Sequence, residues 1–273
     1  MAARLSFILI VLAAGCTEAK MPPVTKHRVI SLSPAATSVV IALGAQDQLA
    51  GISTFCPEVP NHPDLPRLGG LIDPNLEAIA LLQPSLVVLT SGGKATAHRL
   101  QQLGIDSLQL AEGDLGGVID NYRVLGAALN RPEASIRLRT ELENLFAKQP
   151  QKRGKRTLLV FAHEGERYWV ATPKGWLGQL AQRMGLRVVP PGQKGFQALS
   201  AEAIVDLAPE QILELRGQAP GGASLSDLRA RWARFPSLAQ LKDIHLIEDE
   251  ELLQPGASLF RTAQALLPFG GKP

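Results

Sequence analysis

The 273-residue chain is short of cysteine, of aromatic residues and of net charge. It has two cysteines, Cys16 and Cys56, 5% aromatic residues and a formal charge of +3. A charge this small does not indicate a nucleic-acid partner, and the densest basic run, QKRGKR at 151–156, is typical of a basic linker. Lipidation of Cys16 would leave Cys56 alone, and no internal disulfide would then form.

The N-terminal apolar stretch, residues 5–14, is too short to cross a bilayer of about 30 Å. It follows one early basic residue and ends in small residues, which is the layout of a secretory signal. The ending LAAGC resembles a lipobox, in which Cys16 becomes a lipidated N-terminus; ordinary cleavage after Ala14 or Ala19 is the alternative. We predict a signal peptide over residues 1–16 and a mature protein that is periplasmic or attached to a cell surface.

Recognised catalytic patterns are also absent from the sequence. SGGKAT resembles the end of a phosphate-binding loop, but Val88 and Ala95 stand where that motif needs glycine and Ser or Thr. No G-x-G-x-x-G follows a strand, and PGASLF lacks the second glycine of a nucleophile elbow. The five histidines are dispersed, so no metal site is predicted. We expect no enzymatic activity.

What the chain does contain is a repeat. EAIALLQP at 77–84 returns as EAIVDLAP at 202–209, with five of eight positions identical and an offset of 202 − 77 = 125. Asn75 and Ser200 precede the two copies and are residues that favour helix N-caps. The repeat predicts equivalent helices in two halves of the chain. An acid in the first turn favours a helix by about 0.3–1 kcal/mol, so the repeated glutamate has a purely structural explanation as well.

Short apolar stretches alternate with helical patterns over residues 27–114 and again over 155–273. This alternation predicts parallel strand pairing within each half. Between them, residues 115–150 read as helices only, and the helix at 132–148 would be a rod of roughly 25 Å. We therefore predict an α/β protein with two similar α/β lobes joined by a single long backbone helix.

At RVISLSPAATSVVIALGAQDQLAGIS (28–53) the chain resembles the substrate-binding proteins of ABC importers for vitamin B12, haem and ferric siderophores. The resemblance, to the class III family with a helical backbone and most of all to its cobalamin-binding members, continues through FCPEVP, LPRLGGLIDPNLEAIALLQPSLVVLTSGG, YWVATPKGWLGQLAQRMG and ALSAEAIVDLAPEQIL. It covers nearly all of residues 28–267. It implies a ligand cleft between the lobes, no cofactor, and a monomer that delivers its ligand to an importer permease.

The resemblance also gives the repeated glutamates a role. In that family each lobe presents a glutamate that docks onto arginines of the permease, at the positions matched here by Glu77 and Glu202. Two equivalent helices would supply two equivalent anchors for a two-fold permease. Docking and helix stabilisation are compatible, so both can hold for the same residues.

Ligand-binding residues are expected where strands end, because α/β lobes bind ligands at the carboxyl ends of their strands. Phe196 stands where the cobalamin-binding relatives carry Trp, whereas Ser38 replaces their usual Glu and no Trp lies beside Gly92 and Gly93. Each aromatic candidate could equally belong to the core, and a lone Cys is usually a small buried hydrophobe. The candidates are Ser33, Pro34, Phe55, Cys56, Gly92, Gly93, Lys94, His163, Trp169, Trp176, Phe196 and Glu250.

A corrinoid such as cobalamin ranks first among the ligands, since flat and largely apolar molecules suit aromatic walls. Haem ranks second and would need an axial His or Tyr, for which His163 and Tyr168 are candidates. A ferric siderophore ranks third, because it would need a basic pocket and the candidates are Lys94, Lys194 and Arg261. Two hypotheses of other classes remain: an α/β enzyme with an unrecognised site, and a surface lipoprotein that binds only proteins.

Overall fold

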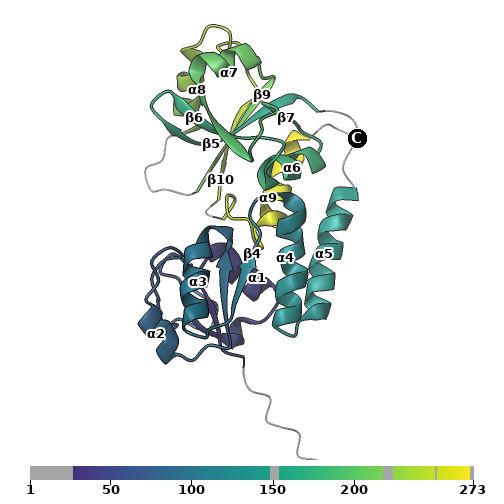
Figure 1. Ribbon diagram of the computed structural model, residues 1–273. Coiled ribbons are helices and arrows are strands. Elements are labelled where there is room, and N and C mark those ends of the chain that lie inside the picture. Colours follow the sequence, from purple (N-terminus) through teal and green to yellow (C-terminus); the bar gives the residue numbers. More distant parts are fainter. Residues whose placement is uncertain (1–26, 148–153, 218–223, 250, 271–273) are drawn as a thin grey trace, which may run out of the picture.

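The computed structural model describes residues 27–147, 154–217, 224–249 and 251–270. Two sheets are present, one in each of two α/β lobes, with helices α4 and α5 beside them (Figure 1). We call residues 27–114 lobe 1 and residues 154–270 lobe 2. This architecture confirms the predicted fold class.

Lobe 1 is built on four parallel strands in the order β2-β1-β3-β4. The central strands β1 and β3 are apolar along their length, and Ile30, Val87 and Val88 are fully buried, as strands covered on both faces require. The elements are β1 (Val29–Ser31), α1 (Pro34–Ala42), β2 (Leu49–Ile52), α2 (Leu76–Leu81), β3 (Leu86–Thr90), α3 (Lys94–Gln102) and β4 (Ser107–Leu110), with short 3-10 helices at Gln46–Gln48 and Ser91–Gly93.

Two helices, α4 (Leu115–Ala128) and α5 (Pro132–Ala147), form the connection and lie side by side (Figure 1). Asp114 caps α4 by accepting a hydrogen bond from the Gly117 N–H at 2.9 Å. Near its start, α4 is bonded to lobe 2 through Leu115 N and Gln179 Oε1 at 2.8 Å. The start of α4 thus lies against lobe 2, and lobe 1 packs against α4 through α1.

Lobe 2 has strand order β10-β9-β5-β6-β8, with β7 also paired to β5. Strands β7 and β9 pair with β5 in parallel, and β10 pairs with β9 in parallel. Strand β6 is antiparallel to β5, and β8 is antiparallel to β6. The elements are β5 (Arg156–Glu164), β6 (Arg167–Ala171), α6 (Trp176–Arg183), β7 (Arg187–Val189), β8 (Phe196–Ser200), α7 (Ala201–Leu207), β9 (Gln211–Arg216), α8 (Leu225–Ala233), β10 (Ile244–Glu248) and α9 (Leu259–Leu266), followed by a 3-10 turn at Leu267–Phe269.

The second lobe departs from the expected parallel pattern at the hairpin of β5 and β6. Gly165 has φ +58°, a left-handed conformation that suits the tight turn between antiparallel strands. Strand β8 and helix α8 were not expected from the sequence. β8 has no apolar run or alternation that a sequence pattern would detect, because it is an edge strand with only partly buried residues.

A segment between β10 and α9 joins lobe 2 to the rest of the molecule. The buried Tyr122 hydroxyl of α4 donates to Gly256 O at 2.9 Å, and Ala257 N donates to Ser38 Oγ of α1 at 3.1 Å. A Cβ at Gly256 would lie 2.3 Å from Ser38 Oγ, so the contact requires glycine there. Ser38, which departs from the cobalamin-binding pattern, therefore receives this crossing segment.

Candidate functional site

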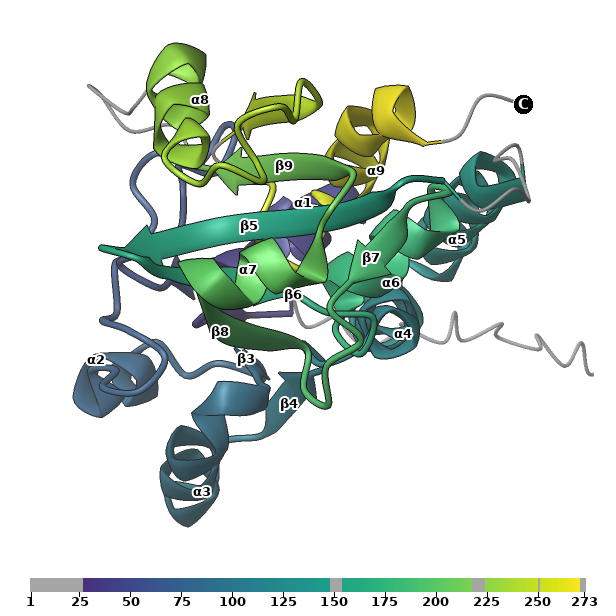
Figure 2. The same cartoon turned by 90° about the horizontal axis from the view of Figure 1, so that it is seen from above.

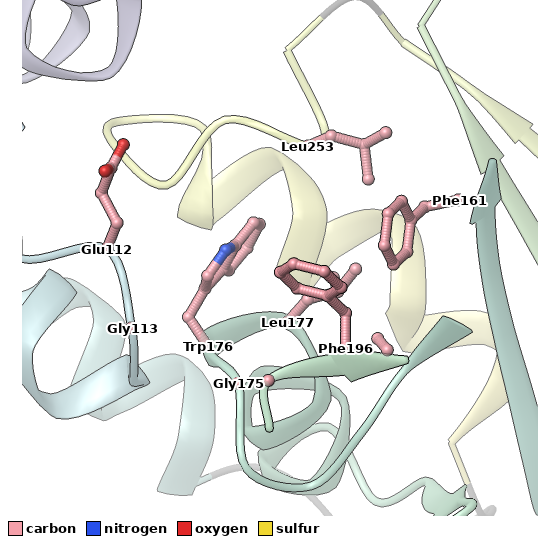
Figure 3. A pocket seen from close by; sticks show the side chains of 10 residues that line it. Glu112, Gly113, Phe161, Gly175, Trp176, Leu177, Phe196 and Leu253 are labelled. Atoms are coloured by element: carbon pink, nitrogen blue, oxygen red, sulfur yellow. The ribbon is translucent and has the colours of Figure 1, made fainter. Parts of the chain in front are cut away.

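An aromatic pocket of about 290 Å³ lies between the lobes (Figure 3). Lobe 1 contributes the residues that follow β4, and lobe 2 contributes an aromatic and aliphatic wall. The lining residues are Glu112, Gly113, Phe161, Ala171, Gly175, Trp176, Leu177, Gly195, Phe196 and Leu253.

The antiparallel part of lobe 2 places the aromatic rings. Phe196 is paired with Ala171, so Trp169, two residues earlier on β6, lies on the same face of the sheet. The ring of Phe196 is 5.9 Å from that of Trp169 and 6.2 Å from that of Phe161, both edge-on. Phe161 lies where the register of β5 shifts against β6. These rings form an aromatic wall, and Phe196 is 55% exposed.

Gly195, just before β8, and Gly175, just before α6, allow the two backbone segments to approach closely. A Cβ on Gly175 would lie 2.6 Å from Gly195 O, closer than side chains come to backbone atoms. Trp176, the first residue of α6, donates its N–H to Gly113 O of lobe 1 at 3.0 Å. The bond fixes the start of α6 against the loop that follows β4, and Trp176 lies between Glu112 and Phe196 in Figure 3.

The structure brings together three of the predicted site residues. Trp176 and Phe196 line the pocket, and Trp169 lies beside Phe196, with the Arg167 guanidinium 5.7 Å from the Trp169 ring centroid. Phe55 of lobe 1 is 75% exposed, lies over Gly70 and is not among the residues that line this pocket.

The thiol of Cys56 lies in the core of lobe 1, not at a pocket wall. The residue is 4% exposed and its Sγ is 3.1 Å from Thr37 Oγ1. Burial raises the pKa of the thiol above its ordinary value, which suppresses the reactive thiolate. Ser33 is buried as well, and its carbonyl accepts a hydrogen bond from Ser31 Oγ at 3.2 Å. For Cys56, these contacts match the expectation of a small buried residue.

The remaining lobe 1 candidates mark the starts of helices. Pro34 is the first residue of α1, and Lys94 is exposed at the first position of α3. Gly92 is exposed, whereas Gly93 is buried under Leu71, where a Cβ would approach a leucine methyl to 2.7 Å. Gly93 therefore has a packing role.

His163 and Tyr168 lie on the opposite face of the lobe 2 sheet from the aromatic pocket. They are cross-strand partners with ring centroids 6.0 Å apart, and the buried Tyr168 ring is 4.7 Å from that of Trp232. Partial burial lowers the pKa of His163, and the nearby Arg231 guanidinium lowers it further. A neutral imidazole is favoured, but it is not directed into the pocket of Figure 3.

Sequence reasoning missed Glu112, Phe161 and Leu253. The rule that selected residues after β3 would also have selected Glu112, which follows β4 in the same sheet. Phe161 belongs to one of the apolar stretches that predict strands, and no sequence signal marks the register shift of β5 at this residue. Leu253 belongs to the segment that crosses between the lobes.

The two repeated helices have the expected form. Asn75 Oδ1 accepts from Ala78 N at 2.9 Å and Ser200 Oγ accepts from Ala203 N at 3.3 Å, so both caps are present. Glu77 and Glu202 are exposed on the first turns of α2 and α7. The helices lie at the outer ends of the two lobes, α7 at the top and α2 at the lower left of Figure 1, and Figure 2 again separates them.

Two predicted residues, Cys16 and Glu250, lie outside the described residues. In the part of the chain that the structure describes, no three His, Cys, Asp or Glu side chains are grouped closely enough to hold a metal ion. Within the same residues, no helix has the length and apolar character needed to cross a membrane.

Comparison with known proteins identifies the family. Residues 29–231 match the model of the periplasmic binding protein family. The chain belongs to this family. Its members are transport proteins that work outside the cytoplasm and deliver small ligands to ABC permeases.

Individual relatives bind different ligands. The high-affinity heme uptake system protein IsdE of Staphylococcus aureus is 25% identical over 219 residues, covering 76% of this chain and 74% of the relative. The periplasmic heme binding protein HutB of Vibrio cholerae has a TM-score of 0.72 at 25% identity, over 89% of this chain and 98% of that one. The vitamin B12 binding protein BtuF of Vibrio cholerae reaches 0.71 at 19% identity, over 89% and 96%. The last likeness concerns the fold alone.

Proposed function

We propose that this periplasmic binding protein captures a corrinoid between its lobes and passes it to an ABC permease. The aromatic pocket carries the proposal: Trp176, Phe196 and Phe161 offer flat apolar surface. Aromatic and aliphatic lining with few polar groups is the usual chemistry of sites for large organic ligands. A cavity of about 290 Å³ accommodates one edge of a macrocycle, and the rest would extend into the space between the lobes.

The charges of the pocket support a corrinoid over a siderophore or haem. None of the lining residues that the structure describes is Lys or Arg, whereas an anionic ferric chelate would need such partners. Among the lining residues that belong to the described part of the chain, none is a His or Tyr that could serve as an axial haem ligand. A corrinoid carries its own axial ligands and neutral carboxamides, so it needs neither.

Haem is the second candidate, because the curated relative IsdE and the structural neighbour HutB are named for haem. Absorbance titration of the purified protein with cyanocobalamin, haemin and a ferric hydroxamate separates the candidates. We expect saturable binding of cyanocobalamin at one equivalent. A Soret band that shifts and saturates with haemin, without cyanocobalamin binding, would replace the corrinoid by haem.

We also propose that Cys16 is the lipidated N-terminus of the mature protein, on the strength of the LAAGC sequence. Intact-mass spectrometry of membrane-extracted protein should give the mass of a chain that starts at acylated Cys16. An unmodified N-terminus at Thr17 or Lys20, or a retained Met1, would contradict it.

A further inference from the structure

Among the described residues that line the aromatic pocket, Glu112 is the only charged one. It follows β4 by two residues, and its Oε2 accepts from Ser91 Oγ, just beyond β3, at 3.2 Å. This is the only hydrogen bond of the carboxylate within the described part of the chain. One side of the group is therefore held by lobe 1, and the rest is available to a ligand.

The surroundings strengthen any interaction that Glu112 makes. Glu112 lies on the opposite side of the pocket from Phe161 and Leu253, and Trp176 lies between it and Phe196 (Figure 3). Charge interactions are stronger beside such low-dielectric groups than in water. Within the described residues, the pocket lining contains no lysine or arginine to neutralise the carboxylate.

We propose that Glu112 is the specificity-determining residue of this site: it accepts hydrogen bonds from N–H donors on the ligand edge and excludes ligands with a carboxylate there. The inference rests on the proposed function and narrows it. Corrinoid carboxamides are neutral donors, whereas the haem edge carries propionates. Charge-assisted hydrogen bonds to the carboxamides and like-charge repulsion of the propionates both favour a corrinoid over haem.

Cyanocobalamin and its monocarboxylic acids make a matched set of probes, because each acid differs by one carboxamide hydrolysed to a carboxylate. For wild type, at least one acid should bind more weakly than cyanocobalamin by about tenfold or more, as juxtaposed like charges require. Glu112→Gln keeps the size and a hydrogen-bond acceptor but removes the charge. It should bind cyanocobalamin a few-fold more weakly and lose most of the discrimination against that acid. Glu112→Lys should favour the acid.

Glu133→Gln, an exposed first-turn acid of α5, is the control for net charge and should leave every ratio unchanged. If wild type binds cyanocobalamin but Glu112→Gln keeps the wild-type preference for each acid, the role of Glu112 is refuted and the proposed function stands. If wild type binds haemin in preference to cyanocobalamin, or binds neither, the proposed ligand and this inference both fail. Melting temperatures measured in parallel show whether a variant has lost binding only through unfolding.

Discussion

The two lobes repeat one helix–strand unit, and the offset of 125 pairs α2 and β3 of lobe 1 with α7 and β9 of lobe 2. Leu89, fully buried in β3, then corresponds to Glu214 in β9, which is 1% exposed. Glu214 Oε1 accepts from Arg216 Nε at 2.8 Å and from Arg231 Nη1 at 3.2 Å. The same position in the same motif is an apolar core residue in one lobe and a buried ion group in the other.

The two lobes also differ in their aromatic residues. Lobe 2 supplies the antiparallel strands β6 and β8, on which Trp169 and Phe196 stand, and lobe 1 has no such strands. Lobe 1 contributes a loop with one carboxylate instead. A repeated scaffold therefore fixes where strand ends meet, and the parts added to one copy determine the chemistry of the pocket.

The largest expected effect tests the buried ion group. Glu214→Gln should destabilise the protein by about 3–5 kcal/mol, because it leaves the mostly buried Arg231 without its carboxylate. Leu89→Ala, its counterpart in lobe 1, should cost about 2–5 kcal/mol through the cavity it leaves. Denaturant unfolding measures both.

A paired replacement separates the two explanations for the Glu214 effect. Glu214→Leu combined with Arg231→Met should be more stable than Glu214→Leu alone, since it removes one of the two arginines that the single variant leaves without the carboxylate. If the double variant is no better than the single one, the ion group is not what distinguishes β9 from β3.

The second effect concerns Glu77 and Glu202, one in each lobe, which we propose dock onto the permease. Glu77→Ala and Glu202→Ala should each weaken docking to the permease by about tenfold or more, as expected for charges desolvated at an interface, and the double variant more so. Both side chains are exposed, so melting temperature and ligand affinity should stay close to wild type. Ligand uptake by proteoliposomes that contain the permease measures the effect.

Asp206→Ala is a matched control, because this exposed acid lies four residues after Glu202 on the same helix. Normal uptake by both glutamate variants would mean that the repeated acid serves only the helix end. If only one of the two glutamate variants loses uptake, the glutamate of the other lobe serves only its helix.

The sequence was sufficient for the parts of the molecule that follow local rules. Alternating apolar strands and capped helices predicted lobe 1, the connection and the paired helices α2 and α7. Phe196 and Trp176 were found because they lie beside motifs of the family. The antiparallel β8 could not be predicted, since it is an edge strand without a marked apolar pattern. Glu112 meets the aromatic residues only through the packing of the two lobes.

The third effect compares the exposed aromatic residue of each lobe. Phe196→Ala should lower ligand affinity by about 1–3 kcal/mol, the range for an aromatic residue at a binding hot spot. Phe55→Ala should not, because Phe55 is exposed without lining the pocket. Neither change should shift the melting temperature greatly. Equal losses for both would extend the binding surface into lobe 1, and no loss for Phe196 would remove it from the site.

The smallest effect concerns the two caps. Asn75→Ala and Ser200→Ala should each destabilise by about 1 kcal/mol, as the loss of an N-cap does. At low pH, where carboxylates are protonated, the two variants compare the cap bonds alone. Asn75→Ala should then have the larger effect, because its bond to the helix is 2.9 Å long and that of Ser200 is 3.3 Å. Denaturant unfolding at several pH values is the measurement.

Ser200 has a second, pH-dependent role, which acts through Glu202. The pKa of Glu202 is lowered by a hydrogen bond from its own backbone N–H and by one from the Ser200 hydroxyl. A carboxylate whose pKa is lowered by folding stabilises the protein above its unfolded-state pKa, and the contribution is lost as pH falls through the folded-state value. Ser200→Ala should therefore raise the pKa of Glu202, and its stability deficit should be larger at neutral pH than in acid. If an NMR titration of Ser200→Ala finds the Glu202 pKa unchanged, Ser200 acts only as a cap for the helix backbone.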